Sequence, residues 1–244
     1  MRISGLNFAY GDKLIFDNFD LDAPSEKVTC IMGPSGGGKT TLLNCISGQL
    51  TFGGQILYGQ NGDGDLSEKS ISYVFQQPRL IPSMTVRKNI EYVMPSSLSK
   101  EQKELKVKSI VEKMQLSDCL DSYPRYISGG QASRTALARA LIVESDILLM
   151  DEPFKGLDIK LKKQILDMLM PLIKDKTVIF VTHDVEEALV VADSIYVVNR
   201  EEGTGVKIIA REEIDEPREE RDAYSQKLNE IRRNVYRALT DENL

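Results

Sequence analysis

The sequence predicts an α/β protein with a parallel sheet, an antiparallel β subdomain near the N-terminus and an inserted helical subdomain. Two buried-strand runs, DILLMDEP and TVIFVTHD, alternate with helical patterns, as in a parallel sheet that has helices on both faces. Residues 1–30 read as short alternating strands, and residues from about 77 to 128 read as a mainly helical insertion. With 244 residues, 41% of them hydrophobic, the chain can form one large domain or two lobes with a real core.

The predicted elements follow in chain order. LNFAY and LIFDNFDLDA alternate apolar and polar residues around the turn GDK, which predicts two strands. KVTCIMG is a continuous apolar strand that runs into glycines, and a helix is expected from Thr40 to Leu50. QILYG and SISYVF predict two more strands before the insertion, which contains the amphipathic stretch SKEQKELKVKSIVEKMQL.

The tail, residues 211–244, is charge-rich and predicts a helix. Its apolar side chains fall on one helical face: Tyr224, Leu228, Ile231, Val235 and Leu239. Two interpretations stay open: a helix packed on the parent domain, or a helix that binds a partner or supports a dimer.

Composition excludes several classes of protein. The net charge of -6 and the pI of about 5.1 make the chain a poor non-specific binder of nucleic acid, which needs clustered Lys and Arg. Cys30, Cys45 and Cys119 show neither metal-ligand spacing nor a disulfide pattern, and we expect reduced thiols in a cytosolic protein. No apolar run approaches the ~20 residues that span a bilayer, so another chain would have to supply any membrane part.

GPSGGGKT, Gly33 to Thr40, matches the phosphate-loop pattern G-x-x-x-x-G-K-[ST] between a predicted strand and a predicted helix. Glycines let backbone N–H groups wrap phosphate oxygens, and the helix N-terminus adds its positive dipole end. Lys39 would reach the β- and γ-phosphates and the Thr40 hydroxyl would ligate Mg²⁺. The loop predicts nucleotide binding without saying what the energy drives.

Asp151 and Glu152 end the hydrophobic strand ILLMDEP. Ligands sit at the carboxyl ends of parallel strands, so Asp151 is expected to hold Mg²⁺. Glu152 points differently and is free to orient or deprotonate an attacking water, which favours hydrolysis.

ISGGQ, residues 127–131, precedes a helical pattern and offers a second anion-binding helix start. One ATP cannot readily occupy both helix starts of a monomer when an inserted lobe separates them. A head-to-tail homodimer, in which the phosphate loop of one copy meets SGGQ of the other, resolves this and gives two equivalent sites.

With these motifs in order, the chain resembles the ATP-binding subunits of ABC transporters over residues 1 to about 210. The resemblance implies a P-loop NTPase (RecA-like) core, an ABC ATPase domain at 1–210 and a helical tail at 211–244. It implies catalytic roles for Glu152, His183 and Gln76, and a magnesium site at Thr40, Gln76 and Asp151. It implies nucleotide contacts from an adenine-stacking tyrosine, the phosphate loop, the partner copy's signature and an interface loop: Tyr10, Gly33, Pro34, Ser35, Gly36, Gly37, Gly38, Lys39, Thr40, Thr41, Ser128, Gly129, Gly130, Gln131 and Asp158.

VFQQPRLIPSMTVRKNI is similar to the corresponding segment of importer subunits for nitrate, sulfonate and taurine. The resemblance therefore implies an importer ATPase with ATP and Mg²⁺ as cofactors, working as an ATP-dependent homodimer at the cytoplasmic face of the membrane. Its partners would be transmembrane permease subunits and, indirectly, a solute-binding protein, with no nucleic acid. In the family this segment receives the coupling helix of the membrane subunit, although a buried hinge is an equally good interpretation from sequence alone.

Some positions depart from the commonest family pattern. Ile127 replaces the leucine that usually opens the signature, and Lys155 stands in FKGLD where a small residue is usual. Neither removes a catalytic group.

Two other functions fit the sequence less well. Soluble ABC ATPases of DNA repair or translation usually carry two fused halves, long coiled coils or zinc insertions, which this sequence lacks. A small-molecule P-loop kinase would need an acceptor pocket and a lid, and would have no reason for SGGQ.

His183 is the only histidine of the chain. A structural core histidine is the simplest interpretation of an isolated imidazole. However, it follows the buried strand VIFV, at the sheet edge where the phosphate loop and Asp151-Glu152 are expected. We therefore expect it to bond the γ-phosphate and sense ATP against ADP.

Overall fold

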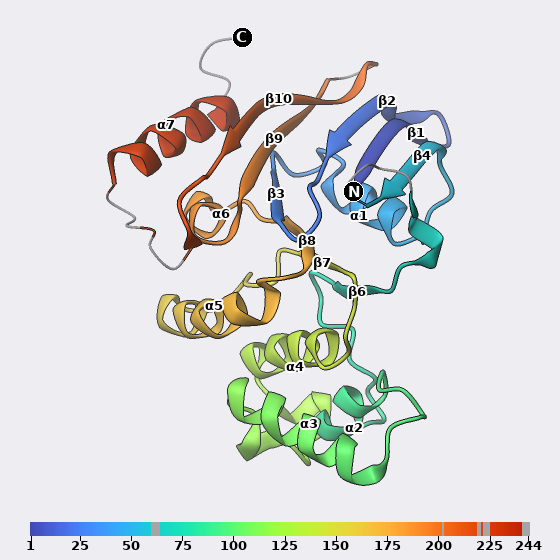
Figure 1. Cartoon of the computed structure of the whole chain (residues 1–244), viewed down its shortest axis with the longest axis vertical. Coiled ribbons are helices and arrows are strands. Elements are labelled where there is room, and N and C mark those ends of the chain that lie inside the picture. Colours follow the sequence, from blue (N-terminus) through green and yellow to red (C-terminus); the bar gives the residue numbers. More distant parts are fainter. Residues whose placement is uncertain (60–63, 202, 219–220, 222–224, 241–244) are drawn as a thin grey trace. The chain divides into compact units, whose positions relative to one another are not determined.

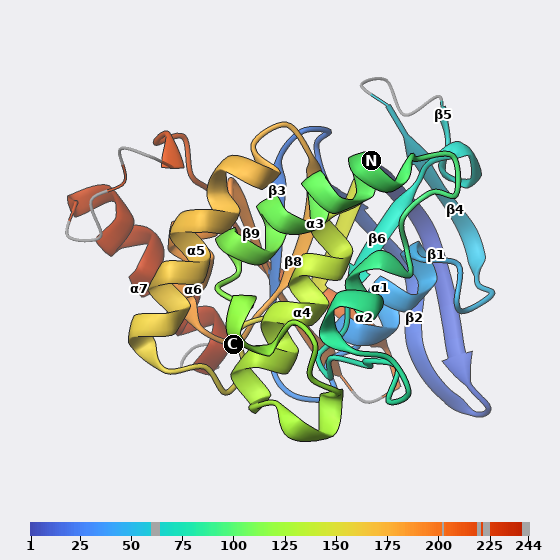
Figure 2. The same cartoon turned by 90° about the horizontal axis from the view of Figure 1, so that it is seen from below.

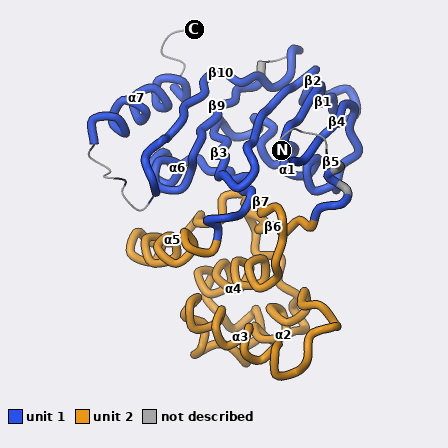
Figure 3. The backbone as a smooth tube through the Cα atoms, viewed as in Figure 1, with its two compact units in different colours: residues 1–69, 173–244 blue, residues 70–172 orange. Residues whose placement is uncertain are grey.

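The computed structural model describes residues 1–59, 64–201, 203–218, 221 and 225–240 (Figure 1). They form two compact units, which are coloured separately in Figure 3. Unit 1 contains residues 1–69 and 173–244, and unit 2 contains residues 70–172.

Unit 1 begins with an antiparallel sheet in the order β2-β1-β4-β5. Ile3 of β1 lies opposite Leu21 of β2 and Ile56 of β4, and all three side chains are buried. Such cross-strand apolar contacts fix the register, because a one-residue slip would turn them to solvent. The strands are β1 (Arg2–Tyr10), β2 (Lys13–Asp22), β4 (Gly53–Tyr58) and β5 (Gly64–Asp65), and the short helix η1 (Leu66–Glu68) follows.

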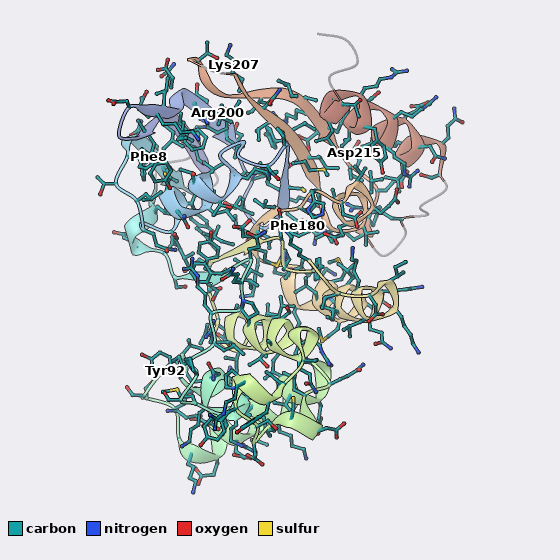
Figure 4. The ribbon with its side chains drawn as sticks, turned by 180° about the vertical axis from the view of Figure 1, so that it is seen from behind. Phe8, Tyr92, Phe180, Arg200, Lys207 and Asp215 are labelled. Atoms are coloured by element: carbon teal, nitrogen blue, oxygen red, sulfur yellow. The ribbon has the colours of Figure 1, made fainter. Side chains whose placement is uncertain are left out.

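The second sheet of unit 1 has β3 at its centre. β3 (Val28–Met32) pairs in parallel with β8 (Thr177–Val181) and with β9 (Ser194–Glu201), and β9 pairs antiparallel with β10 (Gly205–Glu213). Every residue of β3 and β8 is buried, Phe180 included (Figure 4). Burial on both faces explains why these strands read as continuous apolar runs.

The described residues of unit 1 include the α-helices α1 (Lys39–Ile46), α6 (Val185–Val191) and α7 (Gln226–Thr240). The sequence pattern predicts that the first of them extends to Leu50, which is wrong by four residues. Ser47 caps the helix and Gly48 follows with a φ of 70°. A left-handed glycine just after the last turn is a common way for a helix to end.

The tail differs from the sequence expectation at its start. Residues 211–213 complete β10, in which Glu213 lies opposite Ser194 of β9, so the helix begins only at Gln226. α7 buries Leu228, Ile231 and Val235 and contacts α6, β9 and β10, whereas Tyr224 lies outside the described residues. The interpretation of a helix packed on its parent unit is the one that the structure supports.

Unit 2 combines a two-strand parallel pair with a helical group. β6 (Ile71–Val74) pairs with β7 (Ile147–Asp151), and α2, α3 and α4 lie side by side (Figure 2). The helices are α2 (Val86–Glu91), α3 (Lys100–Lys113), α4 (Gly129–Leu141) and α5 (Ile159–Ile173), with the short helices η2 (Ser117–Cys119) and η3 (Pro124–Tyr126). Among the residues that the structure describes, no helix combines the length and the apolar character needed to cross a membrane.

Candidate functional site

The phosphate-loop motif of unit 1 connects β3 to α1, as expected. Gly33 has a φ of 152°, and a Cβ atom there would lie 2.1 Å from the carbonyl oxygen of Val198. No side chain fits so close to a neighbouring strand, so this position requires glycine. The carbonyl of Pro34 accepts the N–H of Gly37 at 3.1 Å, which closes the loop on itself.

The N-terminus of α1 has the properties of an anion site. Its cap is Gly38, which offers no side-chain hydrogen bond, and the first turn has no acidic residue. The first N–H groups of a helix need acceptors, and here no side chain of the cap supplies one. Thr40 is exposed and Thr41 half-buried in that turn, while Ser35 and Gly36 are exposed on the rim of the loop.

The side chain of Lys39 folds back onto the phosphate loop. The side chain is buried, and Nζ donates to the carbonyls of Gly33 and Pro34, each at 2.8 Å. These bonds hold the ammonium against the loop backbone, where a phosphate chain would be cradled.

A hollow of about 500 Å³ borders the outer rim of the loop at residues 34–37. Lys13, Asn199 and Arg200 complete its lining, and Figure 4 shows Arg200 on β9. Tyr10 lies opposite Lys13 in the β1–β2 ladder, is 49% exposed, and packs edge-on against Phe8. An exposed ring next to a hollow beside the phosphate loop can stack on a flat base.

His183 leaves the same sheet edge as the phosphate loop. Ile31 of β3 lies opposite Val181 of β8, so Gly33 and His183 each follow a paired residue by two positions. His183 is exposed, whereas a structural core histidine would be buried. Asp184 caps α6 by accepting the N–H groups of Glu186 and Glu187, which fixes the backbone directly after the histidine.

Unit 2 repeats this geometry with β6 and β7. Val74 lies opposite Met150, and Gln76 and Glu152 each follow by two residues. The parallel register therefore brings the two side chains together, and Gln76 Nε2 donates to Glu152 Oε2 at 2.9 Å. Asp151 is only 4% exposed, and its negative charge adds to the effect of burial, the larger cause, in raising the pKa of Tyr73.

The expected magnesium donors are a hydroxyl, an amide and one carboxylate, from Thr40, Gln76 and Asp151. Hard oxygen donors with few carboxylates suit Mg²⁺, which keeps several waters and binds substrate phosphates. Within the described ranges, no group of three or more His, Cys, Asp and Glu side chains could hold a metal ion.

The signature forms the start of α4. Ser128 Oγ accepts the N–H of Gln131 at 3.2 Å, and Gln131 Oε1 accepts the N–H of Ser128 at 2.8 Å. This reciprocal capping explains Ser and Gln at that spacing. A Cβ at Gly129 would meet nothing within 4 Å, so this part of the helix start is open.

Asp158 performs a similar role for α5. Its Oδ1 accepts the N–H of Leu161 at 3.0 Å, and its carbonyl accepts the N–H of Lys162 at 2.8 Å. The side chain is exposed, and Ile159 beside it is 88% exposed.

Two cationic contacts were missed from sequence. Lys155 Nζ lies 2.6 Å from Glu152 Oε2, and Arg139 of α4 donates to the carbonyls of Pro78 and Arg79. No sequence pattern announces either contact, because each depends on a turn or loop folding back. The capping of Ser128 was readable, since S-x-x-Q before a helix is a capping-box signature.

Comparison with known proteins identifies the family. Residues 16–155 match the family described as ABC transporter. The chain is 39% identical over 214 residues to the sulfate/thiosulfate import ATP-binding protein CysA 2 of Shewanella oneidensis, covering 82% of this chain and 59% of the relative. The chain belongs to the ABC transporter family. It is also 36% identical over 203 residues to the Fe(3+) ions import ATP-binding protein FbpC of Fusobacterium nucleatum, covering 81% of this chain and 55% of the relative.

Solved ABC structures agree with this assignment. A dimeric bacterial ABC transporter cassette matches with a TM-score of 0.75 and 28% identity, over 88% of this chain and 99% of that one. A dimeric post-hydrolysis state of an ATP-binding cassette bound to ADP and Pi matches with a TM-score of 0.74 at the same identity and coverage. The expected α/β P-loop fold is confirmed. The chain spans between 55% and 59% of the length of the curated relatives named above.

Proposed function

We propose that the chain is the ATP-hydrolysing nucleotide-binding subunit that powers solute transport across a membrane, in the direction of import. The observation that carries the proposal is the pairing of Gln76 with Glu152 directly after Asp151, at the carboxyl ends of two parallel strands. These are the groups that position water and metal for phosphoryl transfer, and the chain also has a complete phosphate loop.

The phosphate loop would bind the nucleotide. Lys39 and the backbone of residues 33–41 would hold the β- and γ-phosphates, Tyr10 would stack on the base, and His183 would bond the γ-phosphate. When bound, Mg²⁺ would neutralise the phosphate charge, held by Thr40, Gln76 and Asp151.

Glu152 would orient the attacking water, with Gln76 beside it. The water oxygen forms a bond to the γ-phosphorus while the bond from that phosphorus to the bridging oxygen breaks. ADP leaves with the electron pair, and the proton of the water passes to the Glu152 carboxylate.

A head-to-tail homodimer would complete each site with residues 128–131 and Asp158 of the second copy. Two features support this: the N-terminus of α4 is open at Gly129, and both matched solved structures are dimeric. Closure of two copies over two ATP molecules, and reopening after hydrolysis, would supply the motion.

The partners would be transmembrane permease subunits and, indirectly, a solute-binding protein, at the cytoplasmic face of the membrane. The names of the relatives support import, since they describe import ATP-binding proteins for sulfate/thiosulfate and for Fe(3+). Those names differ in solute, so the proposal stops at the class of importer.

Two variants test the ATPase proposal. Lys39→Ala should abolish binding of a fluorescent ATP analogue, because it removes the cation of the loop. Glu152→Gln should leave binding intact and lower phosphate release by about 100-fold or more, because an amide cannot take the proton. Normal hydrolysis by Glu152→Gln would show that the base is assigned wrongly. Co-purification with a permease encoded nearby tests the transport proposal.

A further inference from the structure

Glu152, the catalytic carboxylate of the proposed function, contacts a second hydrogen-bond donor that has no part in the proposed reaction. Lys155 Nζ lies 2.6 Å from Glu152 Oε2, the same oxygen that accepts from Gln76 Nε2 at 2.9 Å. A carboxylate oxygen has two lone pairs. With two donors in place, this oxygen has no capacity left for a hydrogen bond from water.

The contact is built into a backbone turn. Glu152 has a φ of 46°, in the left-handed region, and its carbonyl accepts the N–H of Lys155 at 3.2 Å. Phe154, within the turn, is 1% exposed and anchors it. The turn therefore brings the Lys155 side chain back to the carboxylate of Glu152, three residues earlier in the chain.

The charges make this contact more than a steric one. A hydrogen bond between charged groups is stronger than a neutral one, so the ammonium holds Glu152 Oε2 in one direction. The Glu152 side chain is 15% exposed and that of Lys155 is 51% exposed, so the lysine can move into solvent and release the carboxylate. A residue with a short side chain at position 155 could not make this contact.

We propose that Lys155 is a latch on Glu152: it is a positioning residue that occupies Oε2 of the carboxylate, fixes its orientation and slows basal ATP hydrolysis until the lysine moves away. This inference rests on the proposed ATPase function. Breaking a partly exposed ion pair of this kind should raise kcat about three- to fivefold, which corresponds to about 0.7 to 1 kcal/mol. A gain in rate cannot arise from a variant that fails to fold.

The test compares steady-state phosphate release by the whole chain and its Lys155→Met and Lys155→Arg variants. Lys155→Met keeps the length of the side chain and removes the charge, so kcat should rise about three- to fivefold while KM for ATP stays within about twofold. Lys155→Arg keeps the cation and should hydrolyse at close to the wild-type rate. Lys160→Met, which removes an exposed charge from the first turn of α5, is the matched control and should change nothing.

Salt and background separate the latch from a general effect on structure. Raising KCl from about 50 to about 500 mM should bring the ratio of the Lys155→Met rate to the wild-type rate toward one. Salt screens the ion pair between Lys155 and Glu152, which only the wild type of these two proteins contains. In a Glu152→Gln background, Lys155→Met should give no increase. An unchanged or lower kcat in Lys155→Met overturns the latch while leaving the ATPase intact, whereas absence of ATP hydrolysis by the wild type overturns the proposed function itself.

Discussion

Arg139 connects helix α4 to the segment that follows Gln76. From α4 its Nη1 donates to the carbonyl of Arg79 at 3.0 Å and its Nη2 to that of Pro78 at 2.9 Å, and partial burial lowers its pKa. Hydrogen bonds from charged groups contribute more than neutral ones, typically about 1.5–3 kcal/mol. Because one bond is exposed and the other part-buried, we expect Arg139→Ala to lower the free energy of unfolding by about 2 kcal/mol.

A protein of this size loses about 2–4 °C of Tm for each kcal/mol, so the midpoint should fall by about 4–8 °C. Circular dichroism measures the midpoint, and hydrogen exchange should show faster exchange of the amides at 79–84. Arg139→Lys can keep one of the two bonds and should lose about half as much. Removal of Lys108, an exposed cation on α3, provides the control. An unchanged midpoint together with unchanged exchange at 79–84 in Arg139→Ala would show that these two hydrogen bonds do not stabilise the segment.

Three further predictions use other parts of unit 1. His183 is the only histidine, so a single imidazole NMR signal should shift when an ATP analogue closes the dimer; an unmoved signal in a closed dimer contradicts its role. Arg221 is 3% exposed and donates to the carbonyls of Leu189 and Val190 at the end of α6. Arg221→Ala should therefore lower the free energy of unfolding, measured with urea, by about 3 kcal/mol. Arg237 is exposed, so Arg237→Ala should lower it by less than about 0.5 kcal/mol. Burial raises the pKa of the Cys45 thiol from its ordinary 9.0 to about 11, so it should resist alkylation at pH 8 until unfolded. The folded state then holds this proton more tightly, so stability should fall as the pH rises from about 9 toward 11, and less so in Cys45→Ala.

The sequence predicted the sheet edge well because buried parallel strands have an unmistakable pattern. Uninterrupted apolar runs placed the ends of β3 and β8, and with them Gly33 and His183. The same logic placed Asp151 at the end of β7 and Glu152 directly after it. The residues directly after a buried strand can therefore be placed wherever the strand itself is recognisable.

The ends of helices and strands, and the side-chain contacts made by turns and loops, were harder to predict from the sequence. The first helix was predicted four residues too long because apolar residues continue past Ser47, although Gly48 marks its end. The sequence pattern predicts the start of the tail where β10 ends at Glu213, because the charged outer positions of this strand resemble those of a solvated helix. The contacts of Lys155 and Arg139 depend on the local path of a turn and a loop, which no periodicity encodes.

Two copies of this chain are expected to close over ATP and to reopen when Glu152 promotes hydrolysis. Sedimentation velocity on Glu152→Gln tests it most directly, with ATP and with ADP. We predict a dimer with ATP and a monomer with ADP, and for the wild type a dimer with ATP that disappears as phosphate is released. A Glu152→Gln variant that stays monomeric with bound ATP, or that dimerises equally with ADP, would contradict this claim.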